Sequence, residues 1–130
     1  MKKLIFTILL ALSIFTLASC HYSSYQATIL IKETTKETFN VSFDSLKGRM
    51  VQKIEKTSDS NDCLKYEASL SKGEVTVYYE IMGDVKPLFT IKGGESVSDS
   101  ITGIKKGVKV YIIIETVEKV EQGKFNFSVK

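Results

Sequence analysis

The chain has 130 residues, with 18 Lys or Arg, 15 Asp or Glu and one His, which gives a formal net charge of +3. This length corresponds to one small domain, and so small a net charge argues against nucleic-acid binding, which needs a clustered basic face. One histidine and two cysteines, without a Cys-x-x-Cys spacing, provide no ligand set for zinc. We therefore expect no metal or other cofactor and no nucleic-acid partner.

The N-terminus begins with Lys2 and Lys3, followed by a mostly apolar run from Leu4 to Leu17. A basic start, a short apolar run and small residues after it are typical of a secretory signal peptide. A transmembrane helix would need about 20 apolar residues, so this run is too short for one. We expect residues 1–19 to be removed, which leaves sixteen basic and fifteen acidic side chains in the mature chain.

Leu17-Ala18-Ser19-Cys20 resembles the lipobox of bacterial lipoproteins. The resemblance covers only the N-terminus and implies that Cys20 becomes the first residue of the mature chain and carries lipid, such as palmitate. A single acyl chain anchors weakly, since each buried CH₂ contributes about 0.8 kcal/mol, but lipoproteins of this class carry more than one chain. The other interpretation is an ordinary signal peptide with a chance cysteine after it.

The composition is biased toward Lys, Glu and Ile, with one Arg, one Pro and no Trp. This bias resembles proteins from A/T-rich genomes and suggests a low-GC Gram-positive organism. The expected location is therefore the extracytoplasmic side of the cell membrane, with the protein held by its lipid. In a Gram-negative organism, the anchor would lie in a periplasmic or outer-membrane leaflet.

The segment 20–35 is expected to be a lipidated tether, because "HYSSYQA" is short and polar. A first strand around Thr28–Ile31, or a continuation of the stalk, would complete it. From Lys36 onward apolar and polar residues alternate with period two, as in half-buried strands, so the domain is assigned to residues 36–130. The inward-facing positions predicted by this alternation are Phe39, Val41, Phe43, Leu64, Tyr66, Ala68, Leu70, Val75, Val77, Tyr79, Ile81, Phe125, Phe127 and Val129.

Four dipeptides that end in glycine precede alternating segments: Lys47-Gly48, Lys72-Gly73, Lys106-Gly107 and Gln122-Gly123. Glycine adopts the positive φ that tight hairpin turns require, so each dipeptide predicts a turn. The segment "SLKGRMVQKIEKT" fits a helix or a strand, and Gly48 with its β-branched neighbours favours a strand. The expected fold is all-β, an antiparallel sandwich of about 7–9 strands, jelly-roll-like or immunoglobulin-like.

The pattern of the C-terminal two thirds supports this fold. A "G-x-V-x-V" strand, a "Y-x-I" strand and a final "G-x-F-x-F" strand are similar to those of pre-peptidase C-terminal and carbohydrate-binding sandwiches. The resemblance covers most of residues 36–130. It consists of strands and turns only, so it implies a fold and carries no catalytic residue to this chain.

The segment "GVKVYIIIETV" is apolar on both faces, because Tyr111 and Ile113 alternate with the inward positions. A strand of this kind is usually central, with something covering its second face. Either a loop or neighbouring strand covers Tyr111, or Tyr111 forms the floor of a ligand surface together with the outward-facing Tyr78, Glu80 and Glu115. These four residues are the candidate ligand-binding set for a glycan or a small ligand.

Catalytic chemistry has little support in the sequence. Cys63 would need a neighbouring base as a nucleophile, and the only histidine is His21, beside the anchor. Asp59, Asn61 and Asp62 in "SDSND" offer oxygens to calcium, but they lack the Gly and Glu of an EF-hand loop, and such residues also serve turns. A glycoside hydrolase needs two carboxylates across a cleft, and Glu80 and Glu115 are outward candidates on separate strands, although exposed Glu is commonplace on a sandwich.

The sequence therefore predicts a lipid-anchored, non-enzymatic envelope lipoprotein whose sandwich contacts another envelope protein. The alternative is a glycan or small-ligand binding module that uses an outer sheet face. A hydrolase is the weaker alternative.

Overall fold

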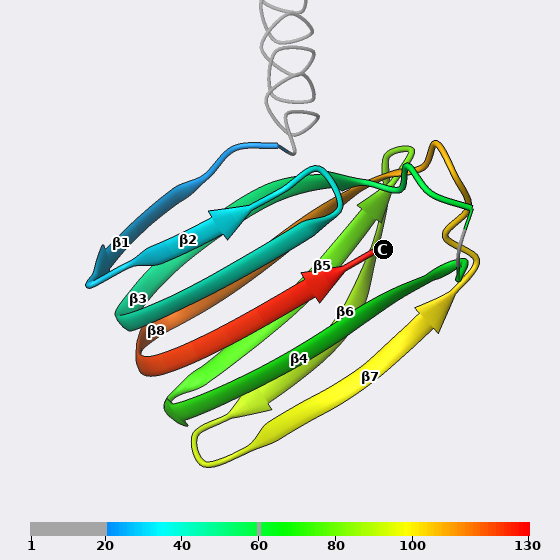
Figure 1. Ribbon diagram of the computed structural model, residues 1–130. Coiled ribbons are helices and arrows are strands. Elements are labelled where there is room, and N and C mark those ends of the chain that lie inside the picture. Colours follow the sequence, from blue (N-terminus) through cyan, green and yellow to red (C-terminus); the bar gives the residue numbers. More distant parts are fainter. Residues whose placement is uncertain (1–20, 60) are drawn as a thin grey trace, which may run out of the picture.

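The computed structural model describes residues 21–59 and 61–130, and its ordered elements are eight strands (Figure 1). The predicted signal peptide, residues 1–19, and Cys20 lie outside the described residues. The strands are β1 (Ser24–Thr28), β2 (Ile31–Thr34), β3 (Thr38–Glu55), β4 (Cys63–Lys72), β5 (Glu74–Ile81), β6 (Asp84–Lys92), β7 (Ser96–Thr102) and β8 (Lys109–Ser128). All strand pairs are antiparallel, which confirms the predicted fold class. The part of the chain that the structure describes contains no helix long and apolar enough to cross a membrane.

Two long strands, β3 and β8, form a bent ribbon that belongs to both layers of the fold. They pair from Thr38 opposite Ser128 to Glu55 opposite Lys109, with a register shift between Leu46 and Gly48. On one side of the shift, the strand order is β2, β3, β8, β4 and β7. On the other side, the order is β1, β3, β8, β5 and β6, and β5 and β6 lie behind β4 in Figure 1.

Aromatic side chains join the two layers. Phe89 of β6 stacks on Tyr66 of β4 with ring centroids 5.0 Å apart, and it also lies 6.4 Å from Phe125 of β8. The predicted inward positions are confirmed, and those that are buried are Phe39, Val41, Phe43, Leu64, Tyr66, Ala68, Leu70, Val75, Val77, Phe125, Phe127 and Val129. Tyr79 and Ile81 are half-buried and pack against this core. Period-two alternation therefore identified much of the core, because successive strand residues point to opposite faces. The core also contains residues that were not predicted, among them Leu46, Met50 and Ile91.

Two of the four predicted glycine turns are wrong. Lys72 ends β4 and Gly73 separates it from β5, and Lys106-Gly107 precedes β8, as expected. Gly48 and Gly123, however, lie inside β3 and β8, where the ribbon bends. A Cβ at Gly48 would collide with the backbone of Ser24 in β1, and a Cβ at Gly123 would collide with the ring of Phe43. Glycine is needed at these positions for close approach within the bend.

The N-terminal part of the described chain contains two strands. β1 and β2 both fall within the range 20–35 that was expected to form a tether. The expected first strand around Thr28–Ile31 is wrong in position, since Ile29 and Leu30 connect β1 to β2. The segment "SLKGRMVQKIEKT" forms a strand over most of its length, as the sequence favoured, because it pairs with β8.

A buried threonine supports the register shift in the ribbon. The Gly48 amide donates a hydrogen bond of 2.9 Å to Oγ1 of Thr116, a β8 residue that is buried. Gly48 is half-buried, and backbone amides that are shielded from water are almost always paired; here the partner is a side chain. Thr116 therefore stabilises the point at which the ribbon passes from one layer to the other.

Replacing this threonine should destabilise the domain. Thr116→Val keeps the side-chain shape and leaves the part-buried Gly48 amide without its acceptor, which should cost about 1 kcal/mol in the free energy of unfolding. Urea unfolding of the full chain in detergent measures this loss. Thr90→Val is the control, because among the described residues the exposed Thr90 hydroxyl bonds only to Thr76, and its effect should stay within about 0.5 kcal/mol. Equal losses in the two variants would contradict the assigned role of Thr116.

Candidate functional site

The four predicted ligand residues lie on the outer face of two neighbouring strands. Tyr78 and Glu80 belong to β5, and Tyr111 and Glu115 belong to β8. Glu80 is directly opposite Tyr111, and Tyr78 is opposite Ile113. Cross-strand partners point to the same face, and so do residues two apart in a strand, so all four share one surface. Tyr78 and Glu115 are half-buried there.

Glu80 is buried, although it points outward from the sheet. Its side chain is only 3% exposed, because the start of the described chain lies over it. Nε2 of His21 donates a hydrogen bond of 3.1 Å to Oε1 of Glu80. The His21 ring also stacks on Tyr111, with centroids 3.8 Å apart and the planes 4° from parallel. His21 therefore occupies the centre of the predicted ligand surface.

Further contacts hold the residues around His21, and we call His21–Ser23 the N-terminal clasp. The Val51 amide donates to Oγ of Ser23 at 2.9 Å. Nε of Arg49 donates to the Tyr22 carbonyl at 3.3 Å, and the guanidinium lies 4.9 Å from the centroid of the Tyr22 ring. Val51 is the cross-strand neighbour of Ile113, which is fully buried. The interpretation that a chain segment covers the second face of β8 is confirmed at Tyr111.

The two side chains of the His21–Glu80 pair differ in their exposure to solvent. Oε2 of Glu80 is buried and has no hydrogen-bond partner among the described residues, whereas the His21 side chain is 47% exposed. A buried carboxylate is costly unless it is paired, so Glu80 depends on His21 for its one hydrogen bond. Chemically, an aromatic face beside a carboxylate acceptor accommodates a planar ring that carries a donor, and the imidazole of His21 is such a ring.

No nucleophile joins this pair in the described part of the chain. No hydroxyl or thiol there forms a hydrogen bond with His21, whose side chain instead contacts Glu80 and Tyr111. Cys63 lies on β4 opposite Thr102 of β7, in the other layer. The structure therefore does not bring Cys63 and His21 together as a catalytic pair.

The residues considered for calcium are used in local contacts. Asp59 lies 3.6 Å from the Nζ of Lys106, and the Asp62 carbonyl accepts hydrogen bonds from the Gly103 and Ile104 amides. Residues 21–59 and 61–130 contain no cluster of three or more His, Cys, Asp or Glu side chains that could hold a metal ion. The Asx residues of "SDSND" that are described thus connect the loops at one end of the sandwich.

Sequence reasoning missed a polar groove on the outer face of the other layer. Asn40, Asn126, Glu67 and Ser98 form a row across β3, β8, β4 and β7, because each is the cross-strand partner of the next. They line a shallow groove of about 460 Å³. Burial, with a contribution from Asp99, raises the pKa of Tyr66 beneath this groove. The signal in the sequence was a polar residue between two buried apolar ones, as in Phe39-Asn40-Val41 and Phe125-Asn126-Phe127, which by itself indicates only a solvated face.

The comparisons with known proteins show likeness in architecture only. Neither the family models nor the curated proteins give a match to this chain. Among solved structures, the cupin domain of an XRE-family transcriptional regulator from Enterobacter cloacae is 13% identical, with a TM-score of 0.38 over 79% of this chain and 97% of that chain. A family 61 carbohydrate-binding module in complex with β-1,4-galactotriose is 15% identical, with a TM-score of 0.39 over 82% and 85%. A family 29 carbohydrate-binding module complexed with mannohexaose is 10% identical, with a TM-score of 0.42 over 85% and 78%.

Removing the His21 ring should release the clasp. His21→Ala loses one hydrogen bond and one aromatic stack, which together correspond to roughly a tenfold change in the opening equilibrium. Hydrogen exchange reports this at the Val51 amide, which donates to Ser23 and should lose protection by about that factor. The amide of Tyr66 in β4 is the internal control and should keep its protection. Unchanged exchange at Val51 would show that the other clasp contacts suffice.

Proposed function

We propose that this protein is an exported, lipid-anchored envelope lipoprotein without enzymatic activity, whose sandwich domain binds another envelope protein. The lipobox-like Leu17-Ala18-Ser19-Cys20 supports the anchor, and its lipid is assigned to Cys20. The extracytoplasmic location follows from the expected signal peptide. The observation that carries the proposed contact with a protein is an exposed apolar turn between β1 and β2.

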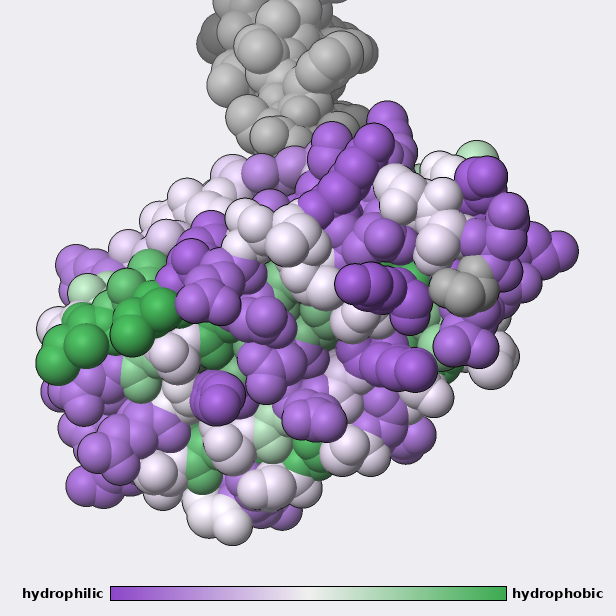
Figure 2. Space-filling model, viewed as in Figure 1, coloured by the Kyte–Doolittle hydropathy of each residue, from purple (hydrophilic) through white to green (hydrophobic). Residues whose placement is uncertain are grey.

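This turn presents isoleucines to solvent. Ile29 is 74% exposed, Ile31 is also exposed, and Leu30 between them is half-buried. Figure 2 shows the corresponding hydrophobic surface at the left, over the β1–β2 turn of Figure 1. Contiguous exposed apolar residues mark interaction sites more often than single ones do. Ile29 is the first residue after β1. It therefore lies about 16 Å along the chain from Ser24, which follows the clasp.

The backbone of the turn adds to this argument. Ile29 has a φ of 48°, in the left-handed region. A β-branched residue is a genuine outlier there, whereas Asn or Gly adopts the conformation readily. The fold by itself gives no reason for isoleucine at this position, and a bound partner would supply one.

The glycan or small-ligand alternative has less support on the predicted face. His21 covers Tyr111 and bonds to Glu80, so two of the four candidate residues are already occupied. The hydrolase alternative loses the same carboxylate, since Glu80 is buried against His21. The proposal therefore places recognition at the β1–β2 turn and not at the covered face.

The anchor is tested by removing its thiol. Cys20→Ser should move the protein from the membrane fraction to the soluble fraction, and metabolic labelling with a fatty acid should find no lipid on it. Cys63→Ser is the matched control, because Cys63 is the only other cysteine. This control should keep both the label and the membrane location. A wild-type protein that is held on membranes without any lipid label would refute the anchor.

The contact with a partner is tested at Ile29. Ile29→Asn removes apolar surface and suits the left-handed backbone, so it should retain the fold while it loses the partner. The measurement is cross-linking in intact cells, followed by purification of the lipoprotein and mass spectrometry. A partner recovered with the wild type should fall severalfold with Ile29→Asn.

Two controls accompany this experiment. Gln122→Asn changes a residue with nearly the same φ, 49°, without removing apolar surface, and Ile29→Leu keeps the surface apolar. Both should retain the partner. Recovery of no protein above background with the wild type would contradict the proposed contact and favour the glycan or small-ligand alternative.

A further inference from the structure

We infer that the end of the sandwich beside the N-terminal clasp docks on a membrane surface that contains anionic lipids. The docking surface consists of Tyr22, Lys53, Met82, Val85 and Lys109. This inference rests on the proposed lipid anchor at Cys20, and it adds to it an orientation of the domain and a lipid chemistry.

The first argument is that no flexible linker separates the expected anchor from the folded domain. Cys20 is bonded to His21, so their Cα atoms are about 3.8 Å apart. The His21 side chain already contacts Glu80 of β5 and Tyr111 of β8. Lipid on Cys20 thus begins within a side-chain length of the sheet. A domain held this closely cannot turn freely, and the elements around His21 face the headgroups.

The second argument is the residue at the tip of the β5–β6 hairpin. Met82 follows Glu80 by two residues, which corresponds to about 7 Å along the strand, close to the thickness of one headgroup layer. It is 98% exposed and has a φ of 52°, and Gly83 after it has a φ of 81°. Two positive φ values are typical of a hairpin turn that prefers Asn-Gly. A flexible apolar side chain here contributes nothing to the fold and suits the boundary of a bilayer.

Other side chains around the clasp extend this apolar contact. Val85, the cross-strand partner of Glu80, is exposed on β6. Tyr22 is exposed within the clasp, where Arg49 holds its ring. Tyrosine is enriched at membrane–water interfaces because one end of its ring system is apolar and the other polar. The apolar residues therefore surround the point where the lipid is expected.

The third argument is charge. Lys53 lies opposite Tyr111, and Lys109 precedes Tyr111 by two residues, so both share the outer face with the clasp. Both are exposed, and neither forms an ion pair within the described residues. The carboxylates nearby are already paired. Glu55 lies 3.2 Å from Lys36, and Asp84 lies 3.6 Å from Lys86. Glu80 lies 3.1 Å from His21. Two unneutralised lysines beside an anchor attract anionic headgroups.

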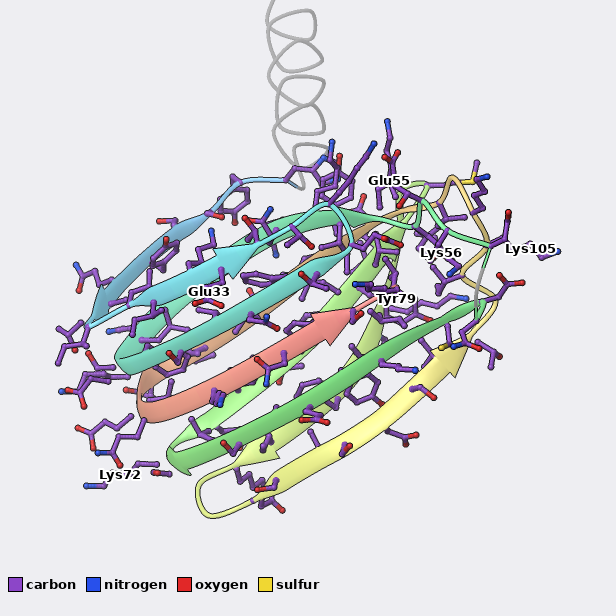
Figure 3. The ribbon with its side chains drawn as sticks, viewed as in Figure 1. Glu33, Glu55, Lys56, Lys72, Tyr79 and Lys105 are labelled. Carbon is purple, nitrogen blue, oxygen red and sulfur yellow. The ribbon has the colours of Figure 1, made fainter. Side chains whose placement is uncertain are left out.

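In this arrangement, the end of the sandwich beside the clasp lies at the membrane and the opposite end lies away from it. Figure 3 shows Glu55 and Lys105 at the upper end, toward which β5 and its hairpin also run, and Lys72 at the opposite end. Val117, which is 85% exposed, follows Tyr111 by six residues of β8, about 20 Å along the strand from the tyrosine that His21 covers. Val117 is therefore a matched apolar position that should remain in water.

The test uses the full-length acylated lipoprotein in vesicles of phosphatidylcholine and phosphatidylglycerol. In a Cys63→Ser background, Met82→Cys or Val117→Cys carries a spin label, and collision with a water-soluble paramagnetic reagent reports exposure. Accessibility should be severalfold lower at position 82 than at position 117. Adding Lys53→Glu and Lys109→Glu, or His21→Ala, should remove this difference, since the first pair reverses the charge and the second releases the clasp.

The possible results separate the docking surface from the anchor. Equal accessibility at positions 82 and 117, on protein whose acyl mass and flotation with vesicles are verified, would overturn the docking surface and leave the anchor intact. Equal protection of position 82 in phosphatidylcholine alone would overturn the assignment to anionic lipids. Protein from cells without an acyl group on Cys20 would instead refute the proposed function.

Discussion

The pairing of β3 with β8 is the constraint on which the rest of the structure depends. Each strand contributes one half to each layer, so the ribbon is both the centre of the two layers and their connection. Its inward residues supply much of the aromatic core, including Phe39, Phe125 and Phe127. Burial of apolar area is the main favourable term in folding. The inward faces of the two layers can cover each other here because the β3–β8 ribbon bends. Gly48, Gly123 and Thr116 make that bend sterically and electrostatically acceptable.

The clasp depends on the ribbon in turn. Tyr111 reaches its place because β8 pairs with β3 on one side and with β5 on the other, which sets Glu80 opposite Tyr111. A carboxylate on this face would ordinarily be solvated, and burying it without a partner would be destabilising. His21 supplies the partner at 3.1 Å and covers the tyrosine at the same time. The first described residue of the chain is thereby part of the folded domain.

These contacts distribute the exposed apolar residues between two ends of the molecule. Met82 lies near the clasp, whereas Ile29 lies beyond the far end of β1. Both have left-handed backbones that do not favour their side chains, so neither is explained by the fold. In the proposed arrangement, the first meets lipid and the second meets protein. The antiparallel scaffold separates the two surfaces because strands are rigid and extended.

The predictions that were confirmed are those that depend on the alternation of apolar and polar residues within one strand. Strand character and inward positions follow from alternation over a few residues, and hydrophobic burial requires that alternation wherever one face is covered. The glycine dipeptides were less informative. Gly73 lies in a turn, whereas Gly48 and Gly123 lie in bent strands, and the same local signal serves both. A glycine shows that a Cβ is not tolerated, but it does not show whether the chain reverses there.

The sequence by itself determined the all-β class, many of the core residues and the outward face that holds Tyr78, Glu80, Tyr111 and Glu115. Only the tertiary structure decided that His21 covers this face, because His21 and Glu80 are 59 residues apart and meet through the register of strands that are distant in the chain. The layer change of the ribbon and the groove along Asn40, Asn126 and Glu67 were decided in the same way. Alternation is a property of a strand alone, whereas register and bending depend on its neighbours.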